Sequence, residues 1–299
     1  MNKKIGFIGQ GWIGKNYAND FENRGYEVVR YSLDDSYINN KEKIGGCDIV
    51  FIAVPTPTRP EGFDDSIVRE AVSLVGGGKI AVIKSTILPG TTESIQNQFP
   101  DKFVFHSPEF LTEKNAAYDA AHPTRNIIGI PSEDLVYKEK AEEVLAVLPD
   151  APLKLICKAK EAELVKYGAN VFLYLKIVYA NMMYDLAKAL DCGWEPVKEA
   201  ISADPRIGGA HMNPVHETLG SLGRGAGGHC FLKDYAAFRQ LYMQLMNNDN
   251  VGINILEDIE MKNLSFLLDS GKDIDIIKGV YGDFLSHGHD HSCGCGHNH

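Results

Sequence analysis

The stretch IGFIGQGWIG at residues 5–14 decides the fold of the first half of this chain. Gly9, Gly11 and Gly14 have the spacing G-x-G-x-x-G between an apolar β-branched run and a segment with helical spacing. In this motif the first glycine permits a tight turn, the second lets a pyrophosphate approach the backbone, and the third allows helix and strand to pack closely. The helix N-terminus then supplies N–H donors for the anion. We therefore favour a dinucleotide-binding βαβ unit over a purely structural glycine turn.

The end of the second expected strand bears on which dinucleotide binds. In GYEVVRYSLDDS, residues 25–36, the strand ends at Tyr31, and Ser32 occupies the position where an acidic residue usually binds the adenosine ribose. Asp34 and Asp35 stand just beyond it. NAD is the favoured cofactor, and NADP stays open. The expected cofactor-binding residues here are Gly9, Gly11, Trp12, Ile13, Gly14 and Ser32.

The periodicity of the apolar residues changes halfway along the chain. The first half alternates short β-branched runs with helical stretches, which is typical of a parallel sheet covered by helices. We expect strands at 4–8, 27–31, 48–53, 79–84, 103–106, 126–130 and 153–156, and helices at 159–190, 195–202, 234–247 and 251–268. The predicted class is α/β, with a Rossmann-type domain at 1–157, a mainly α-helical domain at 158–270, a loose connector at 271–286 and a low-complexity tail at 287–299.

Composition narrows the class of protein. The 299 residues are 44% hydrophobic, which suffices for two ordinary domains. A formal net charge of −10 gives no electrostatic footprint for nucleic acid. No apolar run approaches the ~20 residues of a membrane-spanning helix, and the start of the chain has no signal-peptide core, so we expect a cytoplasmic protein. Six cysteines are too sparse for a disulfide framework and are expected to be reduced thiols.

Two segments that follow expected strands carry candidate polar groups. In STILPGTT, residues 85–92, Thr86 stands where open α/β sheets place their ligands, so it either holds a water or substrate hydroxyl or merely caps a loop. In SPEFLTE, residues 107–113, Glu109 and Glu113 share a face if a helix begins at Pro108; the alternative is two solvated glutamates.

Two further segments lie in the helical half. Lys166 and Asn170 are four residues apart in the apolar run LVKYGANVFLYL, where a cation and an amide on one stripe can polarise a substrate oxygen; a surface lysine is the alternative. In GRGAGGHCFLKD, residues 223–234, a glycine-dense loop presents Cys230 just before an expected helix. Helix N-terminal amides and Lys233 would favour the nucleophilic thiolate, although most single cysteines are inert core residues.

With these motifs in order, the chain resembles the UDP-glucose/GDP-mannose dehydrogenase family from residue 4 to about residue 238. The resemblance rests on the glycine fingerprint, VPTPT (54–58), STILPGTT (85–92), SPEFLTE (107–113), HPTRNIIG (122–129), ELVKYGANVFL (163–173), DPRIG (204–208) and GGHCFLKD (227–234). It implies a four-electron oxidation of a nucleotide-sugar primary alcohol, UDP-glucose-like, to the carboxylate at the expense of two NAD. It also implies a homodimer with neither nucleic-acid nor membrane partners.

The resemblance assigns roles at matching positions. Cys230 would trap the aldehyde as a thiohemiacetal that a second oxidation turns into a thioester, and Lys166 and Asn170 would stabilise the oxyanion. Asp234 and Thr86 would position water, and Glu109 would assist thioester hydrolysis. The implied substrate site comprises Glu109, Phe110, Leu111, Lys166, Asn170, Arg206 and Gly227, with Arg206 commonly acting across a dimer interface. The implied cofactor site adds Thr86, Glu113 and Lys233.

The chain also departs from the family pattern. Ser107 stands where the family commonly has Asn, His229 where it has Ser or Pro, and Leu232 where it has Pro. Residues 209–222 form a longer and more polar link than usual, so we expect an altered sugar pocket. Family members usually carry a third, nucleotide-binding α/β domain, which this chain is expected to lack, so that its hold on the nucleotide would be incomplete.

Two other functions compete with this interpretation. A two-electron β-hydroxyacid-type dehydrogenase shares the Rossmann domain, the helical domain and a Lys-x-x-x-Asn helix, but its chemistry needs no cysteine. The other is a degenerate dinucleotide- or metal-binding protein with little activity. The tail HGHDHSCGCGHNH favours adventitious Zn, Ni or Cu binding, with a purification tail as the alternative. Its candidate ligands are His287, His289, His291, Cys293, Cys295, His297 and His299.

Overall fold

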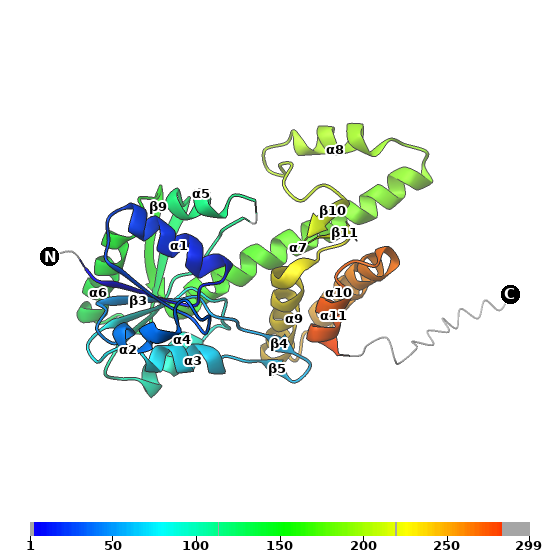
Figure 1. Ribbon diagram of the computed structural model, residues 1–299. Coiled ribbons are helices and arrows are strands. Elements are labelled where there is room, and N and C mark those ends of the chain that lie inside the picture. Colours follow the sequence, from blue (N-terminus) through cyan, green and yellow to red (C-terminus); the bar gives the residue numbers. More distant parts are fainter. Residues whose placement is uncertain (1–2, 113, 219, 283–299) are drawn as a thin grey trace.

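A computed structural model of the chain describes residues 3–112, 114–218 and 220–282. It consists of a sheet flanked by helices and a helical part joined to it by one long helix (Figure 1). The main sheet has the strand order β2-β1-β3-β6-β7-β8-β9. Its strands are β1 (Ile5–Ile8), β2 (Val28–Tyr31), β3 (Ile49–Ile52), β6 (Ile80–Ile83), β7 (Phe103–His106), β8 (Arg125–Ile130) and β9 (Leu153–Lys158). All seven predicted strands are therefore confirmed, and so is the α/β class.

The sheet is parallel from β2 to β7, and β8 then pairs antiparallel with β7 through one residue pair, His106 opposite Gly129. Its central strands are buried on both faces, which explains their continuous apolar runs. Alternate residues enter two separate cores. Helices α1 (Trp12–Asn23), α5 (Ala116–Ala121) and α6 (Leu135–Val147) cover one face, and α2 (Lys41–Ile44), α3 (Ser66–Ser73) and α4 (Thr91–Gln98) cover the other.

Helix α7 (Ala159–Ala189) connects the two parts of the molecule. It packs on the sheet at its start and on α9 (Gly228–Leu245) farther along, while α8 (Trp194–Ser202) lies beside its far end (Figure 1). The rings of Tyr174 on α7 and Tyr235 on α9 stack with centroids 4.0 Å apart in a core shared with α10 (Asn250–Ser270) and α11 (Ile274–Tyr281). The predicted helical second part is thus confirmed.

Two local predictions need correction. Residues 271–286 are not a loose connector over their described part, because α11 buries Ile277 and Val280 in the helical core. Helix α9 begins at Gly228 rather than at 234, so Cys230 lies inside its first turn. The reason in both cases is tertiary packing, which orders segments whose glycines and charges locally indicate a loop.

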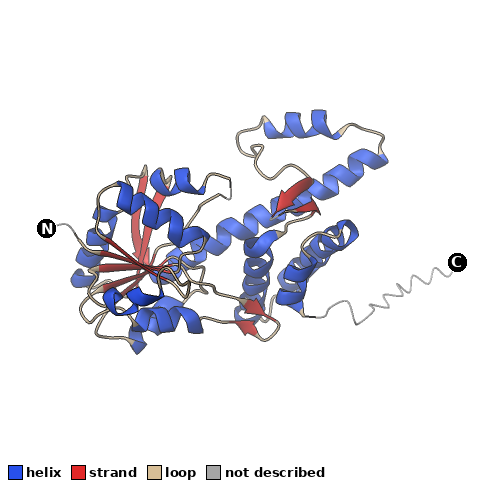
Figure 2. Cartoon of the chain, in the orientation of Figure 1, coloured by secondary structure: helices blue, strands red, loops and turns tan. Residues whose placement is uncertain are grey.

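Two short hairpins were not predicted, and Figure 2 shows both as strands apart from the main sheet. The pair β4 (Thr58–Arg59) and β5 (Gly62–Phe63) contacts α9, and the pair β10 (Val215–Thr218) and β11 (Ser221–Arg224) precedes the glycine loop. Each strand is too short and too polar to show a period of two. Within the described ranges, no helix combines the length and the apolarity required to cross a membrane.

The start of α7 lies so close to β8 that only glycine fits between them. A Cβ at Gly129 would come 2.7 Å from Ala162 Cβ and 2.9 Å from Ala159 Cα. We expect Gly129→Ala to lower the free energy of unfolding by about 1–3 kcal/mol, since neither neighbour can move without shifting the helix.

The matched control is Gly168→Ala, at an exposed position on the same helix with no heavy atom within 4 Å of the added Cβ. It is expected to raise the free energy of unfolding by about 0.5–1 kcal/mol. Urea denaturation followed by circular dichroism compares the two, and equal effects would contradict the close contact.

Candidate active site

A cleft of about 500 Å³ opens at the carboxyl ends of β1, β3 and β6, where they face the start of α9. Ligands of open α/β sheets bind at this edge. The cleft brings together predicted residues from both halves of the chain. Those that line it are Gly9, Gly11, Trp12, Ile13, Ser32, Thr86, Glu109, Cys230 and Lys233.

The glycine turn has the geometry that a pyrophosphate requires. Gly9 has φ +89°, and a Cβ there would meet the Ala53 carbonyl oxygen at 2.1 Å. A Cβ at Gly14 would meet the Gly9 carbonyl oxygen at 1.9 Å, which is the close helix–strand contact predicted for the third glycine. Gly11, by contrast, faces open space at the N-terminus of α1. These residues fit a dinucleotide phosphate held by backbone N–H groups.

The adenosine end of the cleft fits NAD better than NADP. Ser32 lines it and donates a hydrogen bond to Asp34 Oδ2 at 2.8 Å, so a carboxylate lies beside the expected ribose. Glu70 lines the same end. The basic residue of this strand, Arg30, is bound by Glu22 at 2.6 Å, which leaves its guanidinium engaged. A 2′-phosphate would therefore face negative charge.

Glu109 and Lys166 form a buried ion pair between the two halves. Lys166 Nζ donates to Glu109 Oε1 at 2.9 Å and to the Glu109 carbonyl oxygen at 2.8 Å. The backbone N–H of Leu111 donates to Glu109 Oε2 at 2.8 Å. Burial alone lowers the pKa of Lys166, but the carboxylates of Glu109 and Asp234 outweigh it and raise the pKa above its ordinary value. Lys166 is thus a fixed cation behind the cleft.

These contacts correct the expectation of a helix from Pro108. Residues 107–112 are irregular, and the next helix begins at Ala116, because the Glu109 carboxylate and carbonyl are both engaged by hydrogen bonds that a helix does not provide. Glu113, the second glutamate of the pair, lies outside the described residues.

Asn170 and Asp234 form a second buried link, one turn along α7. Asn170 Nδ2 donates to Asp234 Oδ2 at 2.6 Å, and Lys233 Nζ pairs with the other carboxylate oxygen. Asp234 is buried, whereas Lys233 reaches the cleft. Asn170 of the predicted Lys166–Asn170 pair is therefore joined to Asp234 across the α7–α9 contact.

The thiol of Cys230 faces the cleft, but its environment differs from the prediction. Crowding by the cleft walls and then the Asp234 carboxylate raise its pKa, against the opposing influence of Lys233 and Lys166. We expected lysine and the helix N-terminus to favour the thiolate. The expected influence of lysine is present but is outweighed, because crowding by protein atoms and the Asp234 carboxylate act in the opposite direction. These groups together favour the thiol of Cys230 over the thiolate.

Sequence reasoning missed two groups that hold the site together. Glu163, one turn before Lys166 on α7, is fully buried and accepts hydrogen bonds from Gly90 N at 2.6 Å and from Thr92 N at 2.8 Å. It anchors the segment that follows Thr86 to the helical part. The signal in the sequence that could have identified Glu163 was its position three residues before Lys166.

The second missed group is Lys84, at the end of β6. Its Nζ donates to the Ser107 carbonyl oxygen at 3.2 Å and to Ser107 Oγ at 3.1 Å, and it lies 4.4 Å from the centre of the Tyr17 ring. Burial lowers its pKa to about 8. Neighbouring His106 is also buried, and its pKa falls to about 3, so its ring is neutral.

Several predicted substrate residues lie apart from the cleft lining. Arg206 follows α8, its side chain is 88% exposed, and it pairs with its own Asp204. Gly227 is buried beneath Asp273. Phe110 stacks against Arg125 with the guanidinium 3.6 Å from the ring centre, and Leu111 packs on the first core of the sheet.

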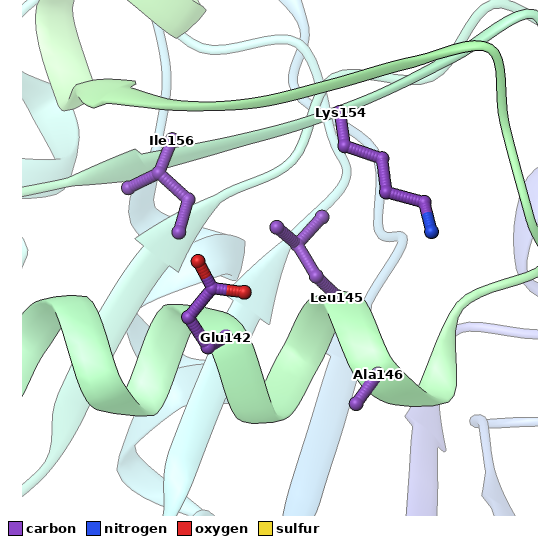
Figure 3. A pocket seen from close by; sticks show the side chains of 5 residues that line it. All are labelled: Glu142, Leu145, Ala146, Lys154 and Ile156. Atoms are coloured by element: carbon purple, nitrogen blue, oxygen red, sulfur yellow. The ribbon is translucent and has the colours of Figure 1, made fainter.

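The seven candidate metal ligands of the tail lie outside the described residues. Among the residues that the structure does describe, no group of three His, Cys, Asp or Glu side chains is placed to hold a metal ion. A second pocket of about 320 Å³ lies between α6 and β9 (Figure 3). It is lined by Glu142, Leu145, Ala146, Lys154 and Ile156 and contains none of the predicted site residues.

Comparison with known proteins identifies the family of this chain. Residues 36–148 match the family model described as UDP-glucose/GDP-mannose dehydrogenase family, NAD binding domain, and residues 160–263 match that of the central domain. The chain is 32% identical over 276 residues to a UDP-glucose 6-dehydrogenase of Rickettsia bellii, covering 88% of this chain and 58% of that protein. A UDP-glucose 6-dehydrogenase of Haloferax volcanii is 27% identical over 284 residues, with 78% and 64% covered. This chain therefore spans less than two thirds of either relative.

A solved structure is similar as well. The UDP-glucose dehydrogenase of the hyperthermophilic archaeon Pyrobaculum islandicum superimposes with a TM-score of 0.74 at 30% identity, covering 89% of this chain and 68% of that one. The similarity extends over both the sheet and the helical part, since it includes most of the chain.

The protonated state of Cys230 can be measured directly. We expect its alkylation by iodoacetamide to rise with pH to a midpoint above the ordinary thiol value, because the protein atoms of the cleft and the Asp234 carboxylate disfavour the thiolate. Peptide mass mapping separates Cys230 from Cys192, which is also exposed and serves as the reference thiol on the same chain. A midpoint below neutral pH would contradict the assignment.

Proposed function

The chain belongs to the UDP-glucose/GDP-mannose dehydrogenase family, and on that premise we propose that it oxidises the primary alcohol of a nucleotide sugar, UDP-glucose-like, to the carboxylate with two NAD. The observation that carries the proposal is that Cys230, Glu109 and Thr86 line the same cleft as the glycine turn. A nucleophile, a carboxylate and a dinucleotide site are thereby placed around one reacting centre.

Each oxidation removes a hydride, which NAD accepts when it is bound. The residues of this chain supply what remains. Lys166 Nζ has three N–H donors, of which two are bound to Glu109, so the third is free for a substrate oxygen. Asn170 Nδ2 likewise keeps one N–H beyond its bond to Asp234. Two donors of fixed position thus stabilise negative charge on that oxygen.

Cys230 supplies the covalent step. Its Sγ forms a bond to the aldehyde carbon, and the thiol proton leaves as the carbonyl oxygen becomes the hydroxyl of a thiohemiacetal. Loss of a hydride from that carbon and of the hydroxyl proton leaves a thioester. Water attacks the thioester, the C–S bond breaks and the thiol is restored beside a carboxylate. Glu109 and Thr86, on the cleft wall, are placed to orient that water.

This mechanism predicts the stoichiometry of the reaction. With a panel of UDP- and GDP-sugars, the accepted substrate should yield two NADH per molecule, measured by absorbance at saturation, and a carboxylate detected by mass spectrometry. Cys230→Ser should abolish carboxylate formation, because an alcohol is a far weaker nucleophile and forms no thioester. One NADH per substrate with an unaffected Cys230→Ser variant would instead establish the two-electron β-hydroxyacid-type reaction.

We further propose that two copies of the chain associate along α7. Phe172, Tyr179, Met182 and Leu186 occupy one face of this helix, and each is at least half exposed. Contiguous exposed apolar surface of this kind is typical of a protein–protein interface. In such a homodimer the exposed Arg206 would act in the cleft of the partner subunit, as the resemblance to the family implies.

A charge in this stripe should prevent association. Tyr179→Glu is expected to shift the chain from dimer to monomer in light scattering coupled to gel filtration, because the carboxylate would be buried unpaired. Leu245→Glu, at an equally exposed apolar position on α9, is the control and should leave the mass unchanged. A wild-type chain that is monomeric at micromolar concentration would contradict the dimer.

A further inference from the structure

The turn between α10 and α11 presses against the loop that carries Cys230. Asp273 Oδ2 accepts a hydrogen bond from the Gly228 backbone N–H at 2.8 Å, and the Asp273 N–H donates to Ser221 Oγ at 3.2 Å. Gly228 is the first residue of α9, and Cys230 is the third. The buried carboxylate of Asp273 therefore satisfies one of the free N–H groups at the end of the helix that presents the nucleophile.

The fit between turn and loop is close enough to require glycine in the loop. A Cβ at Gly227 would come 2.0 Å from Asp273 Oδ2, and a Cβ at Gly223 would come 2.6 Å from Ser270 Oγ. Ser270 Oγ also accepts a hydrogen bond from Arg224 N at 3.0 Å. The many glycines of this loop suggested that it binds a ligand. In the structure they allow the turn between α10 and α11 to pack closely against the loop.

Residues 270–273 lie beyond both family matches, which end at residue 263, and none of them lines the cleft. An effect of this turn on the reaction has to pass through the loop that it contacts. We propose that Asp273 is a positioning residue for Cys230: by holding the N-terminus of α9, it fixes where the thiol enters the cleft. This rests on the proposed function in so far as Cys230 is the nucleophile.

The physical reason lies in the first turn of α9. A helix N-terminus without an acceptor frays, and a displacement of the nucleophile by a fraction of its bond-forming distance slows a reaction strongly. The other charged groups around the thiol are Asp234 and Lys233 on α9, Lys166 on α7 and Glu109 after β7. These four side chains form ion pairs with one another, whereas the Asp273 carboxylate binds the backbone of α9.

The backbone conformation of Asp273 allows its side chain to be replaced without straining the backbone. Its φ is +55°, a left-handed conformation that glycine and asparagine adopt readily. Asp273→Gly therefore removes the carboxylate without introducing backbone strain. Asp273→Asn retains an acceptor oxygen for Gly228 N and should therefore preserve the position of Cys230. Asp275→Asn, at an exposed acid in the first turn of α11, is the matched control.

The experiment measures Cys230 alkylation by peptide mass mapping, together with kcat and the KM for NAD. Asp273→Gly should lower kcat by about tenfold and speed alkylation, with the NAD KM within about twofold, because the thiol is displaced while the glycine turn is not. Asp273→Asn and Asp275→Asn should both resemble the wild type. If Asp273→Gly lowers only the melting temperature and leaves alkylation and kcat unchanged, the residue is merely structural and the inference fails.

The two proposals fail in different ways. A wild-type chain that oxidises no nucleotide sugar removes the proposed function, while the alkylation comparison still decides whether Asp273 controls the thiol. A wild-type chain that yields two NADH, with a fully active Asp273→Gly variant, removes the inference alone.

Discussion

The ion pair between Lys166 and Glu109 is the interaction on which the site depends. It joins the long helix α7 to the irregular segment after β7, so that one buried contact aligns the helical part with the edge of the sheet. Removing one partner of a buried ion pair leaves an uncompensated charge, which costs more than the pair contributes. The main effect of this ion pair is therefore to fix the position of α7 relative to the segment after β7. It sets the position of the cation that the proposed chemistry uses.

Around this pair, each catalytic segment is tied to a second element by a polar group of its own. Glu163 binds the segment that follows Thr86, Asn170 binds Asp234, and Asp273 binds the start of α9. Buried polar groups stabilise a structure only when their hydrogen bonds are satisfied, and here they are satisfied by partners on other elements. The result is a set of candidate site groups held in fixed positions, which the proposed chemistry requires for electrostatic stabilisation of a transition state.

The protonated Cys230 fits this arrangement. Cys230 is exposed, but Asp234 pairs with Lys233 and disfavours the thiolate, which is the reactive form of the sulfur. In the proposed reaction the thiol loses its proton only as the C–S bond forms, when the negative charge moves to an oxygen beside Lys166 and Asn170. The same charges thus protect the resting thiol and stabilise the step in which it reacts.

The sequence by itself determined the strands, the glycine turn and the long helix, and it singled out the candidate residues of the site. These depend on local properties: continuous apolar runs for strands buried on both faces, glycine where φ is positive, and spacing along one helix face. Only the tertiary structure decided three features. No helix begins at Pro108, residues 274–281 pack as a helix, and Asp273 lies against the loop that carries Cys230. The partners in these contacts are far apart in the chain, 57 positions for Lys166 and Glu109 and 64 for Asn170 and Asp234. No local periodicity in the sequence predicts such a pairing of distant residues, because the pairing depends on how the sheet and the helices pack together.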